Sequence, residues 1–107
     1  MRSSDPRATF CRRLRDARVA AGLSQKQLGI KAGLDAFVAS TRVNRYEVGV
    51  HEPDLSMAGR LAKAAGIPLA YLYAEDDQLA KMIFQFVELS KREQRELLQV
   101  LEQPSQP

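Results

Sequence analysis

One stretch, residues 22–49, restricts the possible folds of this chain more than any other. Ser24 and Gln27 stand in the Ser-x-x-Gln relation of a capping box, in which each side chain binds a backbone N–H at the start of a helix. Gly33 can take the left-handed backbone conformation that ends a helix. The stretch therefore predicts a short helix, a tight turn and a second helical segment.

The segment after Gly33 becomes amphipathic toward its end. Val43 and Tyr46 are three residues apart, so they lie on one side of a helix and face the inside of the protein. Side chains that form hydrogen bonds occupy the other side: Ser40, Thr41, Asn44 and Arg45. Two helices joined by a glycine turn, the second with an open polar face, are typical of a helix-turn-helix unit.

Size and composition leave room for one small globular protein. The 107 residues are 45% hydrophobic, which argues against global disorder. No apolar run approaches the ~20 residues of a membrane span, and the first residues lack the apolar core of a signal peptide. The single cysteine, Cys11, cannot form an internal disulfide, which fits a reducing cytoplasm.

Charge is distributed unevenly along the chain. Residues 1–50 carry ten Lys/Arg and four Asp/Glu, whereas residues 51–107 carry six and nine, so a net +3 conceals a basic half and an acidic half. A basic face suits a polyanionic partner, although a basic helix can also be merely solvated.

The hydrophobic periodicity predicts an all-α protein. We expect a disordered arm over residues 1–7, a helical domain over 8–74, a helical hairpin over 75–102 and a loose tail over 103–107. Within the domain, the expected helices cover about 8–21, 25–32, 40–48, 55–65 and a short segment after Pro68. In the hairpin, apolar residues form a broad stripe that needs a surface to cover it: Leu79, Met82, Ile83, Phe86, Leu97 and Leu101.

Three ordered motifs carry a specific resemblance. Gly-Leu-Ser-Gln-x-x-Leu begins at Gly22, Arg-Tyr-Glu-x-Gly begins at Arg45, and Leu-Ala-x-Ala-x-Gly-Ile begins at Leu61, behind Pro53. Together they resemble the Cro/C1-type (XRE-family) helix-turn-helix regulators over about Phe10 to Leu72. The resemblance implies a five-helix lambda-repressor-like domain that binds double-stranded DNA.

The resemblance also assigns roles to particular residues. Its base-reading positions fall on Ser40, Thr41, Asn44 and Arg45. Phosphate contacts are expected from the helix N-terminus at Ser24 and Gln25, from Arg42, and more weakly from Arg15 and Lys26. Arg18 and Glu47 match positions that form an internal ion pair in several relatives.

The spacing between two glycines departs from the family pattern. Gly33 and Gly49 are sixteen residues apart, about four more than the family usually has. In one continuous helix, Phe37 and Val38 would point away from the side that carries Val43 and Tyr46. We therefore expect a break near residues 39–40, with a recognition helix over about 40–48. The alternative is a recognition helix one turn longer that presents Phe37 or Val38 outward.

Two functions fit these features. The first is a sequence-specific regulator, most simply a repressor, that binds a near-palindromic operator as a homodimer held by the C-terminal stripe. The second is an antitoxin or other interaction protein whose stripe holds a different partner. The sequence offers no metal-ligand cluster, phosphate loop or nucleophile–histidine set, so we expect neither an enzyme nor a cofactor. It leaves open whether a small effector exists.

Overall fold

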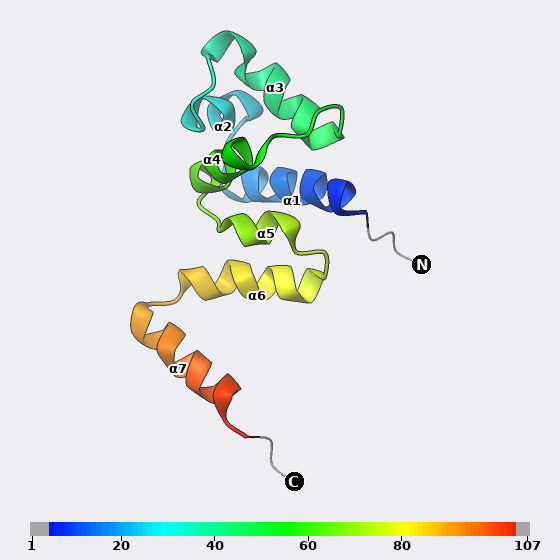
Figure 1. The fold of residues 1–107 in the computed structure, drawn as a ribbon. Coiled ribbons are helices and arrows are strands. Elements are labelled where there is room, and N and C mark those ends of the chain that lie inside the picture. The colour runs from blue at the N-terminus through cyan, green and yellow to red at the C-terminus, as the bar shows by residue number, and fades with distance from the viewer. Residues whose placement is uncertain (1–4, 105–107) are drawn as a thin grey trace.

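The computed structural model describes residues 5–104, and within them the fold is all-α, as the periodicity predicts. The helices follow one another through short connections (Figure 1). In chain order they are α1 (Pro6–Ala20), α2 (Gln25–Lys31), α3 (Ala36–Val48), α4 (Leu55–Ala65), α5 (Leu69–Tyr73), α6 (Asp77–Glu88) and α7 (Lys91–Glu102).

The core lies among the first five helices. Each of them contributes one large side chain that is completely buried, and these five side chains are Leu14, Leu28, Val43, Leu61 and Leu72. Alanines of α4 fill the space around them, so neighbouring helices approach closely. Leu55 is exposed because it occupies the first position of α4.

α1 begins earlier than its hydrophobic pattern indicates. The Asp5 side chain caps it by accepting from Arg7 N at 3.0 Å, and Pro6 occupies the first turn, where its missing N–H costs nothing. Residues 5–7 are therefore part of the helical domain and not of an arm. The remainder of the expected arm, residues 1–4, lies outside the described residues.

α2 and α3 pack against each other more closely than a side chain at position 29 would permit. A Cβ added to Gly29 of α2 would lie 2.7 Å from Ala39 Cβ of α3. Glycine costs helix stability relative to alanine, but here it lets the two backbones touch. The unit that sequence analysis placed over residues 22–49 is thus a rigid pair.

α3 is one continuous helix over Ala36–Val48, so the expected break near residues 39–40 is wrong and the longer recognition helix is right. Asp35 caps the helix by accepting from Phe37 N at 2.8 Å. Ala39 is completely buried, whereas Phe37 is 98% exposed. The error came from assuming that every large apolar residue must be buried; a capped, unbroken helix instead leaves one aromatic ring in solvent.

α6 is attached to the domain by a buried arginine of α1. Arg13 donates from Nε to Ala74 O at 2.9 Å and from NH2 to Glu75 O at 3.3 Å and Asp77 Oδ1 at 2.9 Å. Its guanidinium also lies 5.7 Å from the centre of the Tyr71 ring. These contacts fix the start of α6 against the middle of α1.

The last two helices form an open V (Figure 1). α6 buries Ala80 and packs Ile83 and Phe84 against the core. α7 then points away from the domain, and none of its side chains is buried against the described part of the chain. The two helices therefore do not fold back along each other as the expected hairpin would.

Candidate nucleic-acid interface

The outward face of α3 is polar along most of its length. All four predicted base-reading side chains, those of Ser40, Thr41, Asn44 and Arg45, are exposed. The buried residues of the helix, Ala39, Val43 and Tyr46, lie on the opposite side. Because a helix repeats every 3.6 residues, this separation leaves one continuous face open to an external partner.

Gln25, the first residue of α2, connects the two helices through its side chain. Its Nε2 donates to Asn44 Oδ1 at 3.1 Å and to Glu47 Oε1 at 3.1 Å. Asn44 is therefore exposed to solvent, and its side chain is held in one orientation by Gln25 of α2. An oxygen with two lone pairs can accept a further hydrogen bond, and the Asn44 amide nitrogen keeps its donors.

Behind Gln25, α1 and α3 are joined by an ion pair. Arg18 donates from Nε to Glu47 Oε2 at 2.6 Å and from NH2 to Glu47 Oε1 at 3.2 Å, a two-point contact. The Glu47 side chain is only 4% exposed, so this pair is shielded from solvent. Arg18 also donates to Leu23 O at 3.0 Å, which fixes the turn before α2.

The N-terminus of α2 contains both halves of the predicted capping box. Ser24 Oγ accepts from Gln27 N at 3.0 Å, and Gln27 Oε1 accepts from Ser24 N at 2.8 Å. The Ser24 N–H, which we had assigned to a phosphate, is thus used within the chain. The first-turn N–H groups of Gln25 and Lys26 occupy the positions that have no intrahelical acceptor.

Arg42 lies at the edge of α3 that faces α4. Its NH2 donates to Tyr46 Oη at 2.8 Å, and its guanidinium lies 5.8 Å from the centre of the same ring. With Asp54 and Arg60 it lines a shallow surface depression. The structure therefore places Arg42 beside the open face of α3, at the flank next to α4.

The two weaker phosphate candidates lie on different helices. Lys26 is exposed in the first turn of α2, next to Gln25. Arg15 is exposed on α1 and shares a surface hollow with Arg12 and the end of α3 at Val48 and Gly49. Basic groups thus border the α3 face from both neighbouring helices.

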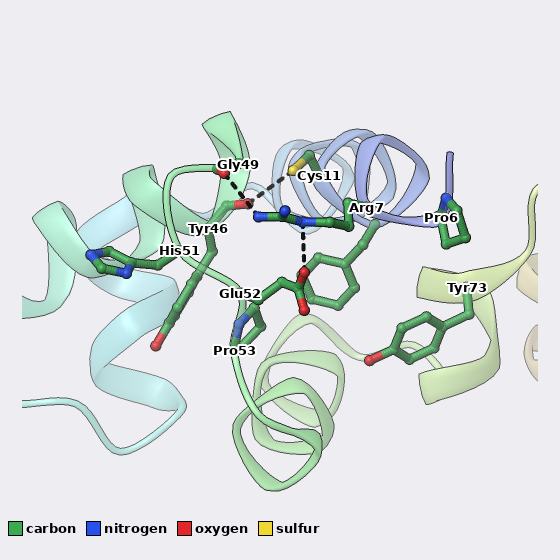
Figure 2. Close-up of a pocket in the computed structure, with 10 residues that line it drawn as sticks. Pro6, Arg7, Cys11, Tyr46, Gly49, His51, Glu52, Pro53 and Tyr73 are labelled. Carbon is green, nitrogen blue, oxygen red and sulfur yellow. Dashed lines mark hydrogen bonds and ion pairs between the residues drawn. The ribbon is translucent and has the colours of Figure 1, made fainter. Parts of the chain in front are cut away.

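A second contact between α1 and the end of α3 was not expected from the sequence. Arg7 forms an ion pair with Glu52, Nε to Oε2, at 2.6 Å and donates to Gly49 O at 3.4 Å, beside a small apolar cavity of about 140 Å³ (Figure 2). Cys11 lies at the same place, where its thiol donates to Tyr46 O at 3.2 Å. These contacts fix the loop that leaves the recognition helix.

The Cys11 thiol is held in its neutral form. Partial burial raises its pKa above the ordinary value, and the nearby Arg7 guanidinium opposes this with a smaller effect. A thiol with a raised pKa is a poor nucleophile. Cys11 therefore packs between α1 and the end of α3, where its thiol contacts Tyr46 O. Within residues 5–104, no cluster of histidine, cysteine and acidic residues is suited to a metal.

The fold and the open polar face of α3 define a helix-turn-helix protein. The helix-turn-helix family profile matches residues 14–72, more than half of the chain, and the protein belongs to this Cro/C1-type family of transcriptional regulators. A curated relative, the cryptic phage CTXphi transcriptional repressor RstR of Vibrio cholerae, is 30% identical over 100 residues, which cover 87% of this chain and 85% of that protein.

A solved structure extends the likeness to the C-terminal helices. The crystal structure of the transcriptional regulator BswR superimposes with a TM-score of 0.83 at 41% identity, over 88% of this chain and 93% of that one. Because the family and both relatives are transcriptional regulators, the protein is a regulator and not an enzyme. Among the described residues, no helix is long and apolar enough to cross a membrane.

Proposed function

We propose that the protein is a sequence-specific repressor that inserts α3 into the DNA major groove and binds a near-palindromic operator as a homodimer. The observation that supports this most directly is the exposed row of Ser40, Thr41, Asn44 and Arg45, with Asn44 oriented by Gln25. A regulator of this kind acts in the cytoplasm, where its DNA lies.

Each of the base-reading residues has a matching chemistry. Arg45 can donate two hydrogen bonds to guanine O6 and N7, and Asn44 can pair with adenine N6 and N7. Thr41 and Ser40 are less selective, because a hydroxyl group both donates and accepts. Each bidentate contact contributes about 1–3 kcal/mol of discrimination against the wrong base.

Contacts with phosphates would set the register of α3 in the groove. Arg42 lies at one flank, Lys26 and the Gln25 N–H at the start of α2, and Arg15 on α1. Such contacts add affinity without sequence preference. Occupation of an operator near a promoter would then exclude polymerase, which is the simplest route to repression, and the relative RstR is itself described as a repressor.

A dimer is supported by the state of α7. A helix of 12 residues that buries no side chain against residues 5–104 is only marginally stable in water, so a partner is needed to cover its apolar residues. Of the predicted stripe, Leu79, Met82 and Leu101 are exposed. Phe86 and Leu97 are half-buried, and Ile83 already packs on its own core. Residues 91–102 carry three Lys/Arg and three Glu, so two copies would not repel each other.

Selection from random duplexes tests DNA recognition. Wild type should enrich one short inverted repeat. Arg45→Ala and Asn44→Ala should each relax preference at one base position per half-site, whereas Arg42→Ala should weaken binding to all sequences equally. Equal loss on every sequence for Arg45→Ala would contradict its assigned role, and a wild type without any preference at modest salt would contradict the proposed function.

A mass measurement in solution tests the dimer. Leu101→Glu places a charge on the α7 stripe and should convert the dimer into a monomer, whereas Val19→Glu, at an exposed apolar position of α1, should leave the mass unchanged. A dimer that persists in Leu101→Glu and in a chain ending at Leu89 would place the interface elsewhere. If a different protein co-purifies with the chain and covers α7, the antitoxin-type function is favoured.

A further inference from the structure

Phe37 is the most exposed large apolar residue of the described chain. Its side chain is 98% accessible, and no packing contact of the core includes it. Full burial of a phenylalanine contributes stability by removing apolar surface from water, so this position gains nothing from its ring within the monomer. Isolated exposed apolar residues are common on protein surfaces, so its position in the fold must decide whether it has a role.

The position is on the reading face of α3. The helix is continuous from Ala36 to Val48, and residues four, seven and eight positions apart share one side. Phe37 therefore lies on the same face as Thr41, Asn44 and Arg45. It occupies the first turn of α3, and the N-terminal residues of a recognition helix contact base edges.

The major groove offers one apolar group to such a side chain. Thymine carries a C5-methyl group there, while cytosine presents an N4 amino donor and no methyl group. We infer that Phe37 is a specificity-determining residue that packs on a thymine C5-methyl group in the operator, an inference that rests on the proposed DNA binding. An aromatic ring would bury that methyl group, and it would leave a cytosine N4–H without an acceptor.

Replacement of thymine by uracil tests this contact, because it removes only the methyl group. In the selected operator, each thymine of a half-site is replaced in turn. For the wild type, we expect one or two positions at which affinity falls about four-fold, the effect of one buried methyl group. At the same positions, Phe37→Ala should bind thymine and uracil duplexes equally well. A 5-methylcytosine at the same position should bind the wild type more tightly than cytosine does.

Controls separate the possible failures. Val19→Ala, at an exposed apolar position outside the recognition helix, should retain the wild-type response to uracil. If Phe37→Ala keeps the same response to uracil as the wild type, the inference is overturned while DNA binding stands. A wild type that prefers no duplex overturns both. If Phe37→Ala changes the mass of the protein in solution but not its response to uracil, the ring contacts a second copy and the inference is again overturned.

Discussion

The side-chain amide of Gln25 donates hydrogen bonds from Nε2 to Asn44 Oδ1 and to Glu47 Oε1, each at 3.1 Å. Glu47 in turn accepts two hydrogen bonds from Arg18. A continuous series of hydrogen bonds thus links Arg18 of α1, through Glu47 and Gln25, to the exposed Asn44 of α3. The orientation of Asn44 depends on contacts that belong to the core of the domain.

Replacement of Gln25 should therefore reduce specificity as well as affinity. In Gln25→Ala, Asn44 loses the donor that orients it, and we expect discrimination at its base position to fall about three- to ten-fold, the effect of one hydrogen bond. Competition binding with matched and mismatched duplexes measures this. Lys26→Ala, the adjacent exposed residue, should weaken all duplexes alike. Additive effects of Gln25→Ala and Asn44→Ala would show that the two side chains act independently.

The Arg18–Glu47 pair should contribute far more to stability than an exposed pair does. Glu47→Gln leaves the Arg18 charge shielded and unmatched, and we expect a loss of about 3 kcal/mol in the free energy of unfolding. Glu96→Gln breaks the Arg92–Glu96 pair, whose side chains are 82% and 59% exposed, and should cost less than about 0.5 kcal/mol. Urea unfolding compares the two variants. Similar losses in both would mean that burial does not strengthen the pair.

Two glycines in helix interiors should respond in opposite ways to alanine. Gly59→Ala in α4 meets no atom within 4 Å and should stabilise the protein by about 0.5–1 kcal/mol. Gly29→Ala would meet Ala39 Cβ at 2.7 Å and should destabilise it by about 1–3 kcal/mol despite the better helix propensity. Thermal unfolding measures both. A stabilising Gly29→Ala would show that α2 and α3 can separate without cost.

Loss of Arg13 should release α6. Arg13→Met keeps the length of the side chain but removes the donors to Ala74 O, Glu75 O and Asp77, and we expect a loss of about 1.5–3 kcal/mol. Hydrogen exchange should become faster in α6 than in α3. Arg12→Met, whose 3.2 Å contact with Asp77 is exposed, should change stability by less than about 0.5 kcal/mol. Equal exchange in α6 of both variants would refute the anchoring role.

Cys11 should react slowly in the folded protein. Because its pKa is raised by burial, the thiolate forms only at higher pH than in the unfolded chain. The contribution of the protonated Cys11 thiol to the free energy of unfolding is fully present below the pKa of Cys11 in the unfolded chain. It is lost as the pH rises through the higher pKa of Cys11 in the folded protein. Iodoacetamide labelling in mildly alkaline buffer should therefore be slower in the native protein than in denaturant, and the signal is unambiguous because Cys11 is the only cysteine of the sequence. Equal rates would indicate an open, ordinary thiol.

The sequence predicts the core and the starts of α2 and α4 well because both are encoded locally, whereas it places the starts of α1 and α3 too late. The capping residues Ser24, Asp54 and Ser90 stand next to the helices they begin. Arg13 could have been recognised by spacing, because it lies on the apolar side of α1, three residues after Phe10. Its acceptors are two backbone carbonyls and the Asp77 carboxylate, all far along the chain, and no sequence pattern reveals them.

The candidate site was predictable in position but not in contacts. Periodicity alone places Asn44 and Arg45 outward, whereas the Gln25–Asn44 hydrogen bond depends on how closely α2 and α3 approach. The continuity of α3 was missed because the sequence argument treated exposure of Phe37 as too unfavourable. The exposed Phe37 ring forgoes its burial energy, about 1.5–3 kcal/mol. A break in the helix would have cost backbone hydrogen bonds instead.

The contact between Gly29 and Ala39 also determines where this unit can vary. Everything in α3 after Ala39 keeps its rotation relative to α2, because the two backbones are locked at that point. The side chains of Phe37 and Val38, which precede it in α3, are exposed and can be exchanged without turning Asn44 or Arg45 relative to α2. Under the proposed function, substitutions in the first turn of α3 would therefore change the operator preference while the rotation of Asn44 and Arg45 relative to α2 stays fixed.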